Sequence, residues 1–165
     1  MVHGFSLRQI GETAWIPFVT AAIGNLAAGV VFRAVLPRAK SVASARRIAI
    51  LIFSALMMSA LLVGNKQSAA ECIALISIAT AGYSGALANL LAVPGDVFSA
   101  GAVASVWGFA SVGSGIGGMV FSLATGWLVD HYSFHPVFLL FGILPVISAW
   151  IVWTLPRQAV LEPAP

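Results

Sequence analysis

The chain alternates long apolar runs with short polar connections. The apolar runs cover residues 13–36, 48–64, 72–93, 101–129 and 137–155. A helix needs about 20 apolar residues to cross the hydrocarbon core of a bilayer, and each run is close to that length or exceeds it. The pattern therefore predicts an all-α membrane protein with five transmembrane helices.

The longest run, 101–129, contains no charged side chain and many small ones. Where a lipid-facing helix would carry large apolar residues, its middle has glycine and serine: Gly108, Ser111, Gly113, Ser114, Gly115, Gly117 and Gly118. Small residues let the backbone of another helix approach closely, and they also loosen a helix. We therefore expect another helix to pack against this run or to move beside it.

Composition supports the membrane class and argues against several others. Hydrophobic residues make up 60% of the chain and charged residues 8%, against about 25% charged in soluble domains. The single cysteine, Cys72, excludes an internal disulfide. The three histidines lack the spacing of metal ligands, so we predict neither a metal site nor a cofactor. Because nucleophile-base patterns, phosphate loops and nucleic-acid motifs are absent from the sequence, we expect neither an enzyme nor a nucleic acid partner.

The basic residues predict how the helices are oriented in the bilayer. Five of the eight lie in the stretch 33–47: Arg33, Arg38, Lys40, Arg46 and Arg47. Short basic loops stay in the cytoplasm, so this loop should be cytoplasmic. With five spans, the N-terminus is then outside and the C-terminus is cytoplasmic. The lipid bilayer is thus the first predicted partner.

The carboxylates lie at the ends of the runs or in the connections: Glu12, Glu71, Asp96, Asp130 and Glu162. Acidic residues within a membrane are costly and are usually functional. We therefore predict no proton-coupling carboxylate within this chain. Pro94, Gly95 and Asp96 are expected to end the third run.

Three segments carry a resemblance to a known family: GFSLRQIGETAWIPFVTAAIGNLAAG, ALANLLAVPGDVF and AVASVWGFASVGSGIGGMVFSLATGWLVDHYS. They resemble the C-terminal half of a major facilitator superfamily transporter. Within that superfamily they are most similar to the anion:cation symporter family and its hexuronate members. The resemblance covers nearly the whole chain, in order.

The resemblance has implications for fold and function. Such transporters hold the substrate at the membrane midplane between two six-helix halves. This chain would correspond to helices eight to twelve, with helix seven and the N-terminal half missing or encoded separately. The implied activity is proton-coupled secondary transport of a sugar acid, such as glucuronate or galacturonate, or a related organic anion, in a bacterial inner membrane. The alternative is a non-transporting remnant or a membrane scaffold.

The resemblance also implies substrate-binding residues. Asn89 lies where the hexuronate pattern has Trp-Ser-Ala-Asn, but the preceding residues here are Ala86, Leu87 and Ala88. Its amide would bind sugar hydroxyls, or alternatively it would form a hydrogen bond between helices. Asp96 matches an acidic position of the family, where it would cap or pair at the cytoplasmic end.

Four further polar residues are candidates for substrate contact. Ser111 matches a substrate-facing position of related transporters, and Ser114 follows one turn later; the alternative for both is close helix packing. Tyr83 would offer a hydroxyl to a sugar or else anchor its helix at the interface. Asn25 would bind substrate or form a packing hydrogen bond.

Overall fold

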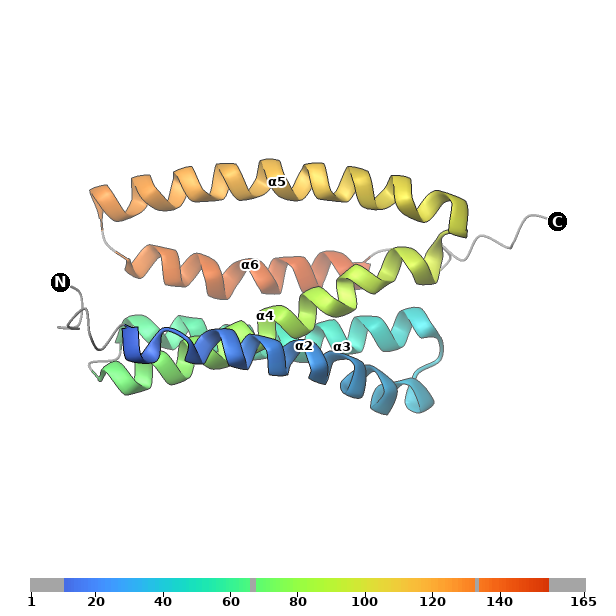
Figure 1. The fold of residues 1–165 in the computed structure, drawn as a ribbon, viewed down its shortest axis with the longest axis horizontal. Helices are drawn as coiled ribbons and strands as arrows, with labels where there is room; N and C mark the ends of the chain where they lie inside the picture. Colours follow the sequence, from blue (N-terminus) through green and yellow to red (C-terminus); the bar gives the residue numbers. More distant parts are fainter. Residues whose placement is uncertain (1–10, 66–67, 133, 155–165) are drawn as a thin grey trace.

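The structure, a computed structural model, describes residues 11–65, 68–132 and 134–154, and its regular secondary structure in these residues is all helical (Figure 1). Five are α-helices and two are short 3₁₀-helices: α2 (Ile16–Val35), η1 (Leu36–Arg38), α3 (Val42–Met57), η2 (Met58–Asn65), α4 (Ala69–Val97), α5 (Ala100–His131) and α6 (His135–Thr154).

Five helical segments are long and apolar enough to cross a membrane. They are Gly11–Arg38, Val42–Gly64, Ala70–Asp96, Ala100–His131 and Pro136–Thr154. The predicted all-α architecture with five long apolar helices is confirmed. Its helices run roughly side by side, so their ends gather at two opposite faces (Figure 1).

Helix α3 begins earlier than the apolar run that predicted it. Ser41 has an extended backbone, and its Oγ accepts a hydrogen bond from the backbone N–H of Ser44 at 3.1 Å, which caps the helix. As a result Arg46 and Arg47 lie within helix α3, and Arg33 lies in the last turn of α2. Much of the stretch 33–47 is therefore helical rather than an open loop.

Helix α4 continues through Pro94 to Val97. Proline lacks a backbone N–H and removes one hydrogen bond from a helix interior. At this position the helix closes within one further turn, where the N–H of Phe98 donates to the Pro94 carbonyl at 3.0 Å. The expected stop at Pro94, Gly95 and Asp96 is thus displaced to the end of the same turn.

Glycines allow α4 to pack closely against α2 and α3, its two main neighbours. A Cβ at Gly24 of α2 would overlap the backbone of Ala81. Towards α3, a Cβ at Gly82 would lie 2.7 Å from the carbonyl oxygen of Phe53, and one at Gly85 would overlap the Phe53 ring. These contacts make α2, α3 and α4 the best-packed part of the molecule.

Hydroxyl groups add polar contacts between the same helices. Thr20 of α2 and Thr80 of α4 lie 3.3 Å apart at their Oγ1 atoms, and both donate to the carbonyl of Pro17. Ser59 of η2 donates to the Leu75 carbonyl of α4 at 3.0 Å. Such hydrogen bonds join helices in membranes, where water is not present to compete.

Helix α5 is set apart from this part of the molecule (Figure 1). None of its residues is buried, and its contacts with α4 and α6 are sparse. At each of its glycines, the described part of the chain places nothing within 4 Å of where a Cβ would be. The small residues of α5 therefore make no close helix contact within the described part of the chain, so the close packing expected there is not found among these helices.

Candidate functional site

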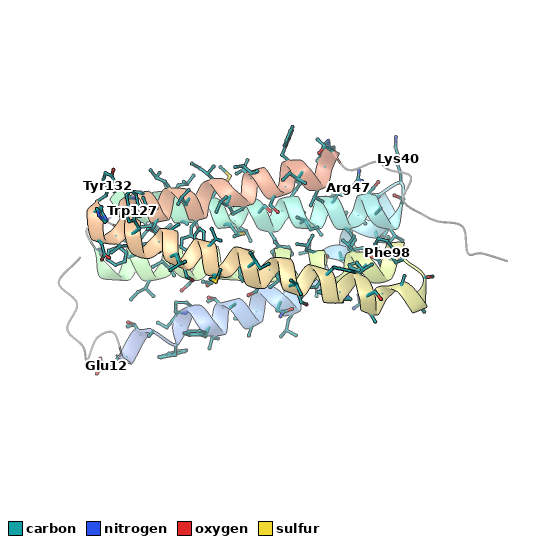
Figure 2. The ribbon with its side chains drawn as sticks, turned by 90° about the horizontal axis from the view of Figure 1, so that it is seen from above. Glu12, Lys40, Arg47, Phe98, Trp127 and Tyr132 are labelled. Atoms are coloured by element: carbon teal, nitrogen blue, oxygen red, sulfur yellow. The ribbon has the colours of Figure 1, made fainter. Side chains whose placement is uncertain are left out.

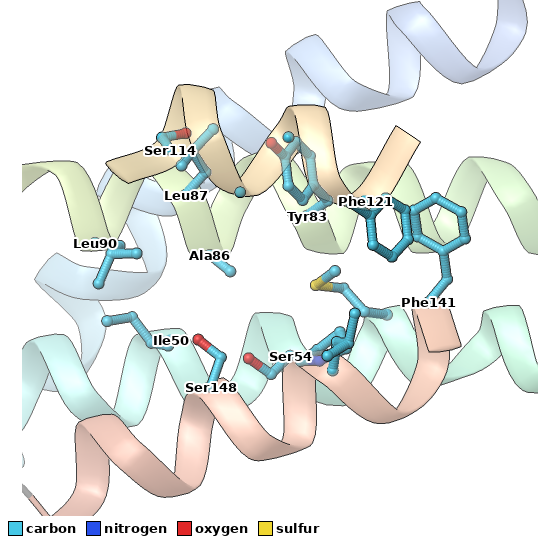
Figure 3. A pocket seen from close by; sticks show the side chains of 15 residues that line it. Ile50, Ser54, Tyr83, Ala86, Leu87, Leu90, Ser114, Phe121, Phe141 and Ser148 are labelled. Carbon is cyan, nitrogen blue, oxygen red and sulfur yellow. The ribbon is translucent and has the colours of Figure 1, made fainter. Parts of the chain in front are cut away.

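A cavity of about 520 Å³ lies between α3, α4, α5 and α6 (Figure 3). Four hydroxyl-bearing residues line it: Ser54, Tyr83, Ser114 and Ser148. The other lining residues are apolar, and none carries a charge. The cavity therefore offers hydrogen bonds to a ligand's hydroxyl groups and apolar contact to its carbon skeleton, but no cation for a carboxylate.

Two of the five predicted substrate-binding residues line the cavity, and three do not. Tyr83 and Ser114 line the cavity from α4 and α5. Ser111 is exposed on α5, and Asn25 is exposed on α2, and neither lines the cavity. Asn89 also lies outside it, in a separate polar cluster. A substrate contact by any of the five stays a prediction.

Two of the four hydroxyl-bearing cavity residues were not singled out in the sequence. Ser54, only 6% exposed, and Ser148 face the cavity from α3 and α6. Their signal in the sequence is slight, because each is a single small hydroxyl with apolar residues on both sides in a long apolar run. Only the rotation of α3 and α6 in the fold brings them opposite Tyr83.

The polar cluster is centred on Arg46 at the start of α3. Its Nε lies 2.7 Å from Oδ2 of Asp96, near the end of α4. Its Nη1 donates to Oδ1 of Asn89 at 3.3 Å, and its guanidinium carbon lies 3.7 Å from the centroid of the Phe32 ring. The planar guanidinium thus contacts a carboxylate, an amide and an aromatic face at once, which a lysine ammonium would not reproduce.

Asn89 is almost fully enclosed in this cluster, with 1% of its surface exposed. Its Oδ1 accepts from Arg46, and its Nδ2 donates to the Gly85 carbonyl at 3.0 Å. Both ends of the amide therefore have protein partners, as the alternative of a hydrogen bond between helices requires. Of the two roles considered for Asp96, capping or pairing, the structure shows an ion pair with Arg46.

The charged side chains gather at the two ends of the helix bundle. Figure 2 shows Lys40 and Arg47 at one end, and Glu12 with Trp127 and Tyr132 at the other. Trp127 stacks on His131 with ring centroids 4.8 Å apart, as in the aromatic belts at membrane interfaces. No group of three residues among the described His, Cys, Asp and Glu is arranged to hold a metal ion.

Comparison with known families identifies the fold to which these helices belong. The profile of the Major Facilitator Superfamily matches residues 2–165. The chain belongs to this superfamily. Its members are membrane transporters and not enzymes, so the five apolar helices of this chain are membrane spans of a transporter fold.

Two curated relatives of this superfamily chain are similar over most of its length. Both are named hexuronate transporter, one from Escherichia coli (strain K12) and one from Escherichia coli O157:H7. Each is 24% identical over 159 residues, which cover 93% of this chain. The chain spans only 36% of the length of either relative. No solved structure matches it significantly.

Proposed function

We propose that this chain forms part of a secondary transporter for a hexuronate, such as glucuronate or galacturonate, or for a related organic anion. The similarity to two hexuronate transporters over 93% of the chain carries this proposal. Transport is coupled to protons and proceeds by alternating access, in which two helical units rock about a site near the membrane midplane.

We propose that the cavity binds the hydroxyl groups of the substrate and that other helices bind its carboxylate. Tyr83 and Ser114 offer hydroxyls for the ring hydroxyls of a sugar acid. The lining residues include no cation, so the partner of the substrate carboxylate comes from helices outside the described part of this chain. We propose that the proton-carrying side chain also belongs to those helices. We propose that a further helical unit, from another chain or an adjoining segment, completes the transporter along the open surface of α5.

The location proposed for the assembled transporter is a bacterial inner membrane, with the Arg46 end of the bundle in the cytoplasm and the N-terminus outside. Five cations at that end support this orientation. A reporter fused to the C-terminus should be active only in its cytoplasmic form. Activity of a reporter that requires export would contradict the orientation.

Uptake of labelled glucuronate tests the transport proposal. The chain is expressed alone, and together with the segment of the Escherichia coli relative that it does not match, in cells lacking hexuronate uptake. We expect uptake only in the second case, and we expect it to collapse when the proton gradient is discharged. If the protein is inserted stably but supports no uptake in either case, the proposal fails. The alternative of a scaffold or remnant is then favoured, and it agrees with an α5 that buries no residue.

Substitutions in the cavity test the proposed binding residues. Losing one neutral hydrogen bond costs about 0.5–1.5 kcal/mol, so Tyr83→Phe and Ser114→Ala should each raise KM by roughly 2- to 10-fold. Ser122→Ala is the matched control, because Ser122 is exposed on the same helix and does not line the cavity. Equal KM values for all three variants and the unaltered chain would exclude both residues from binding.

A further inference from the structure

The turn between α2 and α3 exposes three cations close together in sequence. Arg33 in the last turn of α2, Arg38 in η1 and Lys40 just before α3 are all exposed. We call these three residues the basic turn. Exposed cations at the end of a membrane span lie where the phosphates of lipid headgroups lie.

The positive charge of the basic turn is not neutralised by nearby carboxylates. Of the acidic residues that the structure describes, Asp96 alone belongs to this end of the bundle, and it is paired with Arg46 at 2.7 Å. The first turn of α3, which adjoins Lys40, contains no acidic residue. Helix N-termini carry partial positive charge, so the start of α3 adds to the attraction for anions.

Apolar side chains accompany the three cations. Leu36 is 37% exposed and Val42 is 45% exposed, and they flank Arg38 and Lys40 in the sequence. Exposed apolar groups next to cations suit the boundary between hydrocarbon and headgroups, where the apolar part enters the lipid and the charge stays at phosphate level. A free phosphate ion in water would use the cations alone.

We propose that the basic turn binds the phosphate groups of anionic phospholipids in the leaflet that it faces. The cations attract the net negative charge of the headgroup, while Leu36 and Val42 contact the upper part of the acyl chains. Zwitterionic lipids carry the same phosphate but a compensating ammonium, so they bind less well. This inference does not depend on the substrate of the transporter.

The established role of such cations is to set the orientation of the helices during insertion. That role predicts a different result from lipid binding by the folded chain. The positive-inside effect acts while the chain enters the membrane. A role confined to insertion requires no preference among lipids once the protein is folded. A lipid preference measured on the purified, folded chain therefore separates the two roles.

Native mass spectrometry of the full chain in neutral detergent measures this preference. The chain is mixed with phosphatidylglycerol, with phosphatidylcholine, or with soluble glycerol phosphate, and the retained molecules are counted. The test variant is R33Q/R38Q/K40Q, and R33K/R38K keeps the charge. K66Q is the control, because it removes one cation that the sequence places between the second and third apolar runs.

We expect the unaltered chain to retain phosphatidylglycerol in preference to phosphatidylcholine. Each cation near a charged lipid surface contributes about fivefold, the equivalent of about 1 kcal/mol, so the triple variant should lose roughly 100-fold in affinity for phosphatidylglycerol. R33K/R38K and K66Q should retain the preference, and higher salt should weaken it. Circular dichroism of each variant verifies that the helices are intact.

Three results would overturn the proposal. The first is equal retention of phosphatidylglycerol and phosphatidylcholine by the unaltered chain. The second is a loss in K66Q as large as one third of the logarithmic loss in the triple variant, because total charge would then explain the effect. The third is binding of glycerol phosphate as tight as that of phosphatidylglycerol, which would identify a site for free phosphate esters instead of lipid.

Discussion

Replacing Asn89 with alanine tests whether the polar cluster around Arg46 holds α3 against α4. The substitution removes the acceptor of the 3.3 Å hydrogen bond from Arg46 and the donor of the 3.0 Å hydrogen bond to the Gly85 carbonyl. Because Asn89 is 1% exposed, water does not readily replace either partner. Arg46 keeps its ion pair with Asp96, so the loss is confined to the amide.

The expected loss follows from the geometry. Hydrogen bonds between membrane helices are worth about 0.6 kcal/mol on average and up to about 1.7 kcal/mol. A charged donor strengthens the Arg46 contact, but its length of 3.3 Å is beyond the usual range, so we assign it about 1 kcal/mol. The Gly85 contact lies within α4 and adds about 0.5 kcal/mol. Asn89→Ala should therefore lower the free energy of unfolding by about 1.5 kcal/mol.

Unfolding of the full chain in mixed micelles, followed by its helical circular dichroism as denaturing detergent is added, measures this loss. Asn25→Ala makes the same chemical change at an exposed amide and should stay within about 0.5 kcal/mol of the unaltered chain. A double-mutant cycle with Asp96→Asn adds a second measurement. Since Asn89 and Asp96 both contact Arg46, their effects should be coupled by at least about 0.5 kcal/mol.

Two outcomes would refute this reasoning. If Asn89→Ala changes the free energy of unfolding no more than Asn25→Ala does, the cluster does not stabilise the α3–α4 contact. If the cycle shows no coupling, Arg46 does not link the two side chains as the distances indicate. Uptake per inserted molecule then separates the roles of Asn89, because a substrate contact would raise KM even after correction for stability.

Three other predictions concern packing. Gly24→Ala should cost about 1–3 kcal/mol, since its Cβ would overlap the Ala81 backbone, whereas Gly29→Ala, with open space around it, should be neutral or stabilising in the same unfolding assay. Cys72 is 4% exposed, so its thiol should react with a maleimide at least tenfold more slowly in the folded chain than in the unfolded chain. Mass spectrometry follows the reaction. Equal rates in the two states would show that the surroundings of Cys72 open freely. Gly113→Leu should change the free energy of unfolding by less than about 0.5 kcal/mol, because no described residue lies near its Cβ position. If another helix packs there in the completed transporter, the same substitution should reduce uptake. Unchanged uptake would count against that contact.

The number and type of the helices followed from the sequence because long apolar runs have few stable structures in a bilayer. Their ends were less accessible. Helix α3 begins after the Ser41 cap, so that polar residues such as Arg46 are part of the helix. The end of α4 depends on how much one missing hydrogen bond at Pro94 costs, and near a helix end the cost is small enough for the helix to continue to Val97.

The arrangement of the site followed from the sequence only in part. Tyr83 and Ser114 were candidates, and the fold places both at the cavity. The partners of Asn89 were not foreseen, since Arg46 is 43 residues away in the sequence, and its cation had been assigned only to orientation in the membrane. Contacts of this kind depend on how neighbouring helices are rotated, and hydrophobic runs without strong amphipathic character do not encode that rotation clearly.

The length of α5 has a consequence for the bilayer in which the chain resides. Its 32 residues make it about 48 Å long, whereas the 20 described residues of α6 span about 30 Å, close to the thickness of the hydrocarbon core. A helix that is too long for its bilayer tilts, or the lipid around it thickens. In the chain by itself, α5 buries no residue against its neighbours, so its tilt is opposed mainly by lipid. Membranes with shorter acyl chains should therefore incline α5 further while the α2–α4 contact stays unchanged.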